Sequence, residues 1–275
     1  MITFLSYLKA KSLEEAWKMN QKRSNRLIAG MGWSKMSHAT LATALDLSGL
    51  ALDQIEETEE EFIIGAMVTL RQFECHQGLN TYFHQAPKDS VRHIVGVQFR
   101  NCATMGGSVW LRAGFSDPLT LLLALDTSVE LYQGEEKTTR IPLDDFCKMK
   151  KNNDLLVSIH IKKDGRKVVY ESFRNTQTDF PVLTVAVSQI SAGDGKENGE
   201  NPNYCATVGA RPSLCCKVEG QNPEALIKEA MELNYQDNIR ATAGYRQHLS
   251  QVLIRRAYDR VCQLAACTEE EAANK

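Results

Sequence analysis

Apolar and polar residues alternate along this chain in short runs, which predicts many brief strands and helices rather than a few long ones. Ser12-Leu13-Glu14-Glu15 has the spacing of a capping box, because the serine and the second glutamate can each accept an N–H group at a helix start. We expect a short helix from there to about Asn20. The apolar run Leu27-Ile28-Ala29 predicts a buried strand, and residues 30–34 predict the loop that leaves it.

The same periodicities predict the elements up to residue 161. They are a hairpin with strands at 55–57 and 62–66, a helix after a cap at Thr69, a helix over 91–99, a helix from Asp117 through Leu125, and strands at 129–132, 140–143 and 155–161. Pro118 supports the helix that begins beside it, because the first turn of a helix needs no N–H from that position.

The last third of the chain predicts an antiparallel sheet with two helices, after a subdomain boundary between 164 and 178. Strands are expected at 182–190, 204–208 and 214–218, and helices after Asn222-Pro223 and over 249–264. The segment 193–201 is rich in turn formers and charges, and we interpret it as a hairpin loop rather than a site. Strands and helices together indicate an α+β fold.

Composition excludes several classes of protein. The chain has 275 residues, 43% of them hydrophobic, and a formal net charge of -2. A nucleic-acid-binding domain is usually strongly basic, so we expect no nucleic-acid partner. The N-terminus lacks a basic leader and a long apolar segment, so neither a signal peptide nor a membrane span is indicated, and we expect a cytoplasmic protein.

The eight cysteines do not have the spacing of a cluster site. No CxxC pair occurs among them, whereas iron-sulfur and structural zinc sites usually need closely spaced thiolates. Scattered cysteines in a cytosolic chain are more often reduced and partly buried. We therefore expect no metal site in this chain.

Two glycine-containing turns carry the candidate chemistry. Residues 100–108, Arg-Asn-Cys-Ala-Thr-Met-Gly-Gly-Ser, combine an amide, a hydroxyl and two adjacent glycines. Such a turn can hold a phosphate, since glycine allows close approach and successive N–H groups can converge on an anion. Residues 26–34 carry a second such turn at the end of a predicted strand. The two turns together could bind one diphosphate. Gly106-Gly107 taken alone could equally be a tight turn.

At these turns the sequence resembles the FAD-binding subunit or domain of the molybdenum hydroxylase family, which includes xanthine dehydrogenase and aerobic carbon monoxide dehydrogenase. Residues 100–108 are close to the family pattern RNxATxGGN, and the resemblance spans nearly the whole chain. Further landmarks follow in order: Ser116-Asp117-Pro118, the run 122–126, the strand 157–159, Asp179, and the run 243–249.

The resemblance implies a fold and a domain division. The fold would be α+β, with a two-subdomain FAD-binding α/β region followed by a C-terminal antiparallel sheet with helices, similar to the carbon monoxide dehydrogenase flavoprotein. The FAD-binding domain would span residues 1–165, with a subdomain boundary near 55, and the C-terminal flavoprotein domain would span 166–275.

The resemblance also implies which residues contact FAD, and it implies no catalytic acid, base or nucleophile. The implied FAD-binding residues are Ile28, Ala29, Gly30, Met31, Gly32, Trp33, Ser34, Asn101, Thr104, Met105, Gly106, Gly107, Ser108, Asp117 and Leu156. The two glycine turns would hold the diphosphate, Asp117 would accept a hydrogen bond from the sugar-like portion, and Leu156 would lie against the flavin.

Several of these residues have a purely structural alternative. Asp117 could cap the helix that begins at Pro118, and Asn101 could stabilise its own turn. Leu156 could be an ordinary core residue of a strand, and Trp33 could simply pack beside its loop.

This chain also departs from the family pattern. Relatives commonly have AGGT or a close variant where this chain has Ala29-Gly30-Met31-Gly32-Trp33. Met31 restricts positive φ, and Gly32 removes a hydroxyl donor, so FAD affinity should be affected. Ser108 replaces the final Asn of the second motif, and Glu171 aligns approximately with a lysine found near the flavin in some relatives.

By this resemblance the chain is an electron-transfer subunit. Electrons from substrate oxidation at a molybdopterin-binding large subunit would pass through an iron-sulfur small subunit to FAD, and then to NAD or another acceptor. The alternative is a flavin-poor structural or assembly subunit with the same fold. A free-standing FAD oxidoreductase is a third reading.

Overall fold

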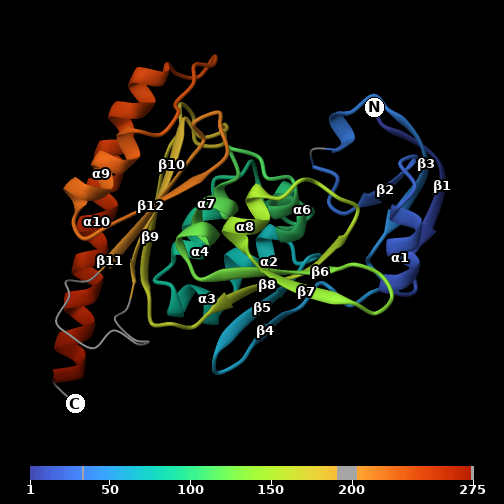
Figure 1. Ribbon diagram of the computed structural model, residues 1–275, viewed down its shortest axis with the longest axis horizontal. Coiled ribbons are helices and arrows are strands. Elements are labelled where there is room, and N and C mark those ends of the chain that lie inside the picture. The colour runs from blue at the N-terminus through green and yellow to red at the C-terminus, as the bar shows by residue number, and fades with distance from the viewer. Residues whose placement is uncertain (33, 191–202, 274–275) are drawn as a thin grey trace. The chain divides into compact units, whose positions relative to one another are not determined.

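The computed structural model describes residues 1–32, 34–190 and 203–273, and its elements are labelled in Figure 1. Two compact units are formed, each from three segments of the chain. The first unit comprises Met1–Phe73, Val95–Leu111 and Thr127–Lys162. The second comprises Glu74–Ile94, Arg112–Asp126 and Lys163–Lys275. The family division at 165/166, with a boundary near 55, stays a prediction.

The first unit begins with a small parallel sheet. Its strands are β1 (Thr3–Lys9), β2 (Asn25–Ile28) and β3 (Thr40–Asp46), in the order β1-β3-β2, with α1 (Leu13–Asn20) between β1 and β2 and a short 3₁₀ turn η1 (Ser34–Met36) before β3. The predicted capping box is confirmed, since the Ser12 hydroxyl accepts the Glu15 N–H at 3.1 Å. The Glu15 carboxylate accepts the Lys11 N–H at 2.7 Å, one residue before the cap.

A five-stranded antiparallel sheet forms the rest of the first unit. Its order is β4-β5-β8-β6-β7, from β4 (Ile55–Glu57), β5 (Glu61–Gly65), β8 (Leu155–Lys162), β6 (Thr127–Tyr132) and β7 (Thr138–Pro142). Alternate residues such as Phe62, Ile64 and Ile159 are fully buried, as expected for a sheet with one covered face. The short helices in this part of the chain are α2 (Leu70–Cys75), α5 (Val97–Arg100), α6 (Met105–Trp110) and α8 (Leu143–Lys148).

The second unit contains a four-stranded antiparallel sheet with helices on both faces. Its order is β12-β11-β10-β9, from β12 (Cys216–Gly220), β11 (Asn203–Gly209), β10 (Leu183–Ile190) and β9 (Lys167–Phe173). The helices are α3 (Gln77–Tyr82), α4 (Ala86–Val91), α7 (Asp117–Ala124), α9 (Pro223–Met231) and α10 (Ala243–Ala273). In Figure 1, α10 runs along one side of this sheet and α4 and α7 lie on the other. The predicted antiparallel sheet is confirmed, and the loop predicted at 193–201 lies outside the described residues.

Most of the predicted helix starts are confirmed by their caps. The Thr69 hydroxyl accepts the Gln72 N–H at 3.1 Å, and the Asn222 side chain accepts the Ala225 N–H at 2.9 Å. At α7 the capping residue is Ser116, whose hydroxyl accepts the Leu119 N–H at 3.4 Å. These bonds satisfy N–H groups that have no partner inside the helix.

The helix predicted over 91–99 is wrong. Helix α4 ends at Val91, and α5 begins only at Val97. Val95 between them has a φ of 51°, which is left-handed backbone that a β-branched residue rarely adopts. The apolar spacing in this segment does not mark one buried helix face, since Val91 is buried whereas Val95 and Val97 are exposed.

The start of α10 is fixed by a buried arginine. Arg246 is 1% exposed, and its guanidinium donates to the carbonyl oxygens of Val182 and Ala210 and to the side chain of Asn238. Val182 precedes β10 and Ala210 follows β11, so one side chain ties the helix to two strand ends. Burial lowers the pKa of Arg246.

Helix α6 lies close to the backbone of residues 66–68. The Gly106 N–H donates to the Ala66 carbonyl at 2.9 Å, and the Met105 N–H donates to the Val68 carbonyl at 2.8 Å. A Cβ atom on Gly106 would lie 2.5 Å from the Ala66 oxygen, which is closer than real Cβ contacts come. Glycine is required here for close approach of two backbone segments.

We predict that Arg246→Ala lowers the free energy of unfolding by about 3 kcal/mol, because two buried carbonyl groups and the Asn238 side chain lose their donor. Arg256→Ala on the exposed side of the same helix is the control, and it should change stability by no more than about 0.5 kcal/mol. Urea unfolding followed by circular dichroism measures both. Equal midpoints for the two variants would contradict the anchoring role of Arg246.

We also predict that Gly106→Ala destabilises the first unit by about 1 to 3 kcal/mol, since the added methyl group forces α6 away from Ala66. The matched control is Gly244→Ala in α10, where a Cβ atom meets nothing within 4 Å. The control should be neutral or stabilising by up to about 1 kcal/mol. Thermal unfolding of both variants, with intrinsic tryptophan fluorescence as the probe of the first unit, tests this difference.

Candidate functional site

The first unit brings the two glycine turns together. Gly30, in the turn after β2, lies against the backbone of Cys102 and Ala103, and a Cβ atom on Gly30 would overlap the Cys102 carbonyl. Gly32 lies against the ring of Phe99, at 2.6 Å between a built Cβ atom and Cζ. Gly30 is therefore required by contact with the backbone of the second motif, although the two are about seventy residues apart in sequence, and Gly32 packs on the side chain that precedes that motif.

Met31 adopts the left-handed conformation that relatives can give to a glycine. Its φ is 53°, whereas neither Gly30 nor Gly32 has positive φ. A left-handed backbone costs a residue with a side chain about 1 to 2 kcal/mol. The substitution thus retains the strained conformation of the loop and adds a steric cost to it.

The first turn has backbone N–H groups that can donate to a ligand. Among the described residues, no acceptor receives the N–H groups of Gly30, Met31 and Gly32. These residues are half-buried, and Ala29 before them is exposed. Successive N–H groups around a left-handed residue form a concave donor surface for an anion. Ile28 and Ser34 flank this turn and are also half-buried, and Trp33 lies outside the described residues.

The second turn uses its backbone donors internally. The Gly107 N–H donates to the Thr104 hydroxyl and the Ser108 N–H donates to the Thr104 carbonyl, both at 3.1 Å, while those of Met105 and Gly106 go to residues 66–68. The convergence of N–H groups expected here is therefore wrong for this motif. Its two glycines serve close packing and helical backbone rather than positive φ.

What the second turn can offer a ligand is its side chains and its surface. The Thr104 hydroxyl accepts one bond and keeps its own proton to donate. Asn101 and Gly107 are exposed, and the Ser108 hydroxyl donates to the Thr104 carbonyl at 2.9 Å. Asn101 is the C-terminal cap of α5, and its backbone N–H donates to the Val97 carbonyl.

Asp117 is held inside the second unit. It is 4% exposed. Its carboxylate accepts a hydrogen bond from the Tyr170 hydroxyl at 2.5 Å and forms an ion pair with Arg174. Burial raises the pKa of Asp117, and the Arg174 charge opposes that shift. Because Ser116 makes the capping bond, Asp117 supports α7 through its position in the first turn, and its carboxylate is engaged by two side chains.

Leu156 is a buried residue of β8, 7% exposed, opposite Leu131 of β6. The register of the two strands shifts between Glu130 and Leu131, so a β-bulge lies directly beside this pair. Bulges re-aim nearby side chains. The geometry is that of a core residue at an irregular point of the sheet.

The donor set fits FAD at one turn. A diphosphate needs converging N–H donors, and Gly30, Met31 and Gly32 supply them at a half-buried surface. Thr104 can add a hydroxyl donor from the motif that Gly30 contacts. The role of the other predicted residues stays a prediction.

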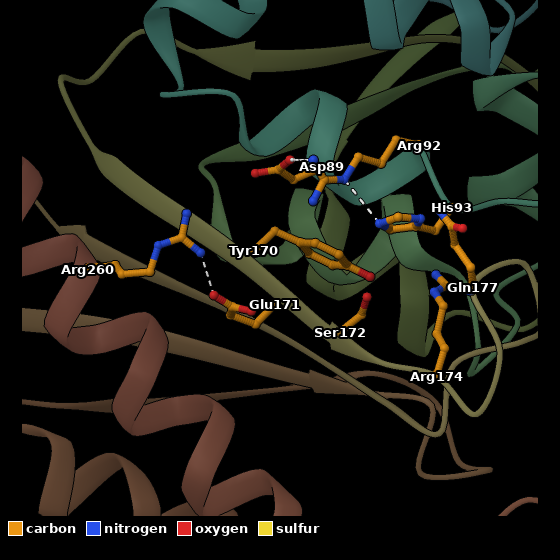
Figure 2. Close-up of a pocket in the computed structure, with 9 residues that line it drawn as sticks. All are labelled: Asp89, Arg92, His93, Tyr170, Glu171, Ser172, Arg174, Gln177 and Arg260. Atoms are coloured by element: carbon orange, nitrogen blue, oxygen red, sulfur yellow. Dashed lines mark hydrogen bonds and ion pairs between the residues drawn. The ribbon is translucent and has the colours of Figure 1, made fainter.

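A cavity of about 390 Å³ lies in the second unit, at the outer strand β9 (Figure 2). Its walls come from α4, the turn after it, β9, the loop that follows and α10. The lining residues are Asp89, Arg92, His93, Tyr170, Glu171, Ser172, Arg174, Gln177 and Arg260. Of these the sequence singled out only Glu171, because no spacing rule groups arginines that lie so far apart along the chain.

Two features are absent from the part of the chain that the structure describes. No cluster of three or more histidine, cysteine, aspartate or glutamate side chains there has the arrangement of a metal site. None of the helices in that part combines the length and the apolar character needed to cross a membrane.

Solved structures share this architecture, and a curated protein is similar in sequence over most of its length. A reconstituted carbon monoxide dehydrogenase from Oligotropha carboxidovorans superposes with a TM-score of 0.81 and 20% identity, covering 94% of this chain and 97% of that one. Quinoline 2-oxidoreductase from Pseudomonas putida 86 gives a TM-score of 0.80 and 17% identity, covering 95% and 98%. The protein YgfM of Escherichia coli strain K12 is 24% identical over 259 residues, which are 92% of this chain and 94% of that protein.

The predicted α+β fold with a C-terminal antiparallel sheet is confirmed by these superpositions. A family model described as the FAD binding domain in molybdopterin dehydrogenase matches residues 3–162, which is more than half of the chain and includes both glycine turns. This confirms the resemblance that residues 100–108 carried. The chain belongs to the family of FAD-binding domains in molybdopterin dehydrogenases.

Proposed function

We propose that this chain is the FAD-binding electron-transfer subunit of a molybdopterin-dependent hydroxylase or dehydrogenase. Its proposed partners are a molybdopterin-binding large subunit and an iron-sulfur small subunit. FAD, when bound, supplies the redox chemistry, taking electrons from iron-sulfur centres on a partner and passing them to NAD or another acceptor. Substrate oxidation belongs to the partner subunit, and this chain contributes no catalytic acid, base or nucleophile.

The observation that carries the proposal is the turn at Gly30, Met31 and Gly32. Its three N–H groups have no acceptor within the described residues, and its backbone is held in place by contact with Cys102. Fixed backbone donors can disperse the charge of a diphosphate without basic side chains. This suits a chain whose formal net charge is -2.

The remaining predicted residues have supporting roles in this proposal. Thr104 donates its hydroxyl proton to the diphosphate, and Leu156 provides an apolar surface for the flavin. Asp117, a buried carboxylate that Tyr170 and Arg174 hold in place, would contact the sugar-like portion of FAD. Each of these residues would bind or orient the cofactor, and none would move a proton in the reaction.

A flavin-poor structural or assembly subunit is the second candidate, and one observation favours it. The side chain of Met31 disfavours the left-handed conformation that the diphosphate turn requires. The same fold with a weakened turn would still assemble with its partners. Flavin content of the purified chain separates the two candidates.

We predict that the full chain takes up FAD, and that Gly30→Ala abolishes the uptake, because the added methyl group overlaps the Cys102 carbonyl and drives the two turns apart. Gly96→Ala is the matched control, since the nearest atom to its Cβ is 3.4 Å away. Calorimetric titration with FAD, supported by flavin absorbance after desalting, measures both. A folded wild-type chain that binds no FAD, alone or with its partner subunits, refutes the proposal and supports the flavin-poor alternative.

We further predict that Met31→Gly tightens FAD binding by up to about tenfold. Glycine holds the left-handed conformation without the steric cost, so a larger fraction of the free chain has the turn ready for the diphosphate. Met36→Gly, at a 70% exposed methionine nearby, controls for the loss of a methionine side chain. An equal change in the dissociation constants of the two variants would show that the backbone of Met31 has no part in binding.

A further inference from the structure

The cavity beside β9 has several arginine side chains on its walls. Three guanidinium groups line it, those of Arg92, Arg174 and Arg260, against two carboxylates, Asp89 and Glu171. Arg92 pairs with Asp89 at 3.2 Å, and Arg260 pairs with Glu171. The carboxylate that pairs with Arg174 is Asp117, which does not line the cavity.

His93 lies beside Arg92 on this wall, where its Nε2 atom accepts from Nε of Arg92 at 3.1 Å. Three arginines and two carboxylates line the cavity. Asp117 supplies a third carboxylate from outside the lining, so each of the three guanidinium groups has a carboxylate partner.

Arg174 is the rigid part of the cavity wall. Its side chain is 7% exposed, and it donates to the Asp179 carbonyl at 2.6 Å and to Asp117. Its Nε atom is buried and has no acceptor among the described residues. A buried donor without an acceptor is costly, and on a cavity wall it marks the place where an acceptor on a ligand would be stabilised.

The other side of the cavity is more open. The side chains of Arg92 and Arg260 are about half exposed, at 49% and 51%. In Figure 2, Arg260 and Glu171 lie on one side of the cavity and Arg174 and Gln177 on the other. Burial raises the pKa of Asp89, which also feels the charges of Arg92 and Arg260. Charged side chains from α4 and α10 thus lie beside β9, the outer strand of the sheet.

We propose that this cavity binds a small organic anion that carries a phosphate or carboxylate group. The guanidinium groups match the planar oxygens of either group, and Ser172 and Gln177 supply neutral donors beside them. Asp89 and Glu171 can accept from hydroxyl or amino groups on the rest of the ligand. The volume of about 390 Å³ lies within the range of small-molecule sites and exceeds the needs of an inorganic anion.

The test uses the full chain without FAD, so its outcome is independent of the flavin proposal. Glycerol 3-phosphate, succinate and neutral glycerol are titrated at constant ionic strength, with calorimetry for affinity and amide chemical shifts for location. Glycerol 3-phosphate and succinate separate a phosphate ligand from a carboxylate ligand. We expect one of them to bind and to shift amides of β9 and α4, and we expect glycerol to do neither.

Charge variants decide whether the cavity is responsible. Arg260→Gln should weaken binding of the anion about tenfold, and Glu171→Gln should tighten it several-fold. Arg255→Gln is the matched control, because Arg255 is an exposed arginine of the same helix that pairs with Glu224 at 3.0 Å. It should leave the affinity unchanged. Arg174→Lys keeps the charge beside Asp117 and removes Nε, so it should also weaken binding.

The opposite results overturn the proposal. They are no binding of either anion at millimolar concentration, shifts confined to other parts of the chain, or an equal effect of Arg255→Gln and Arg260→Gln. Arg260 and Arg255 are both exposed on α10, so circular dichroism is expected to show both variants folded and the comparison stands even where Arg174→Lys fails to fold.

Discussion

The contact between Gly30 and the carbonyl of Cys102 is the constraint on which the candidate FAD site depends. No side chain lies between the two turns at this point, since a single methyl group on Gly30 would overlap the Cys102 backbone. The turn after β2 is thereby positioned by the segment that leads into α6. That segment is in turn held to residues 66–68 by the N–H groups of Met105 and Gly106. The N–H groups of the turn around Met31 stay open within the described residues, whereas those of Met105 and Gly106 donate to the carbonyls of Val68 and Ala66 and hold the second turn in place.

The two glycine motifs therefore have different roles. Both suggested phosphate cradles from their composition, yet only the turn around Met31 leaves its N–H groups open within the described residues. Glycines 106 and 107 lie in helical backbone, and Gly106 is needed for contact with Ala66. The left-handed φ of Met31 shows that tertiary contacts can impose a conformation that the residue itself disfavours.

Buried arginines organise the second unit in two different ways. Arg246 donates to two buried carbonyl oxygens and to the side chain of Asn238, and it fixes the start of α10. Arg174 also pairs inside the unit, but it forms part of a cavity wall together with Arg92 and Arg260. A buried cation needs several acceptors to offset its lost hydration. Where the cation also borders a cavity, that requirement can extend to a ligand.

The sequence by itself determined most of the elements, because caps and periodicity act over a few residues. Ser12, Thr69 and Asn222 cap the helices that their spacing predicted, and residues 100–108 were sufficient to identify the family. The sequence could not determine that residues 91–99 form no continuous helix, since a left-handed φ at a β-branched residue such as Val95 runs against its local preference. Only the tertiary structure decided which N–H groups are open, that Asp117 pairs with Arg174, and that three distant arginines share one cavity. These depend on contacts between segments far apart in the chain, and local patterns carry no information about them.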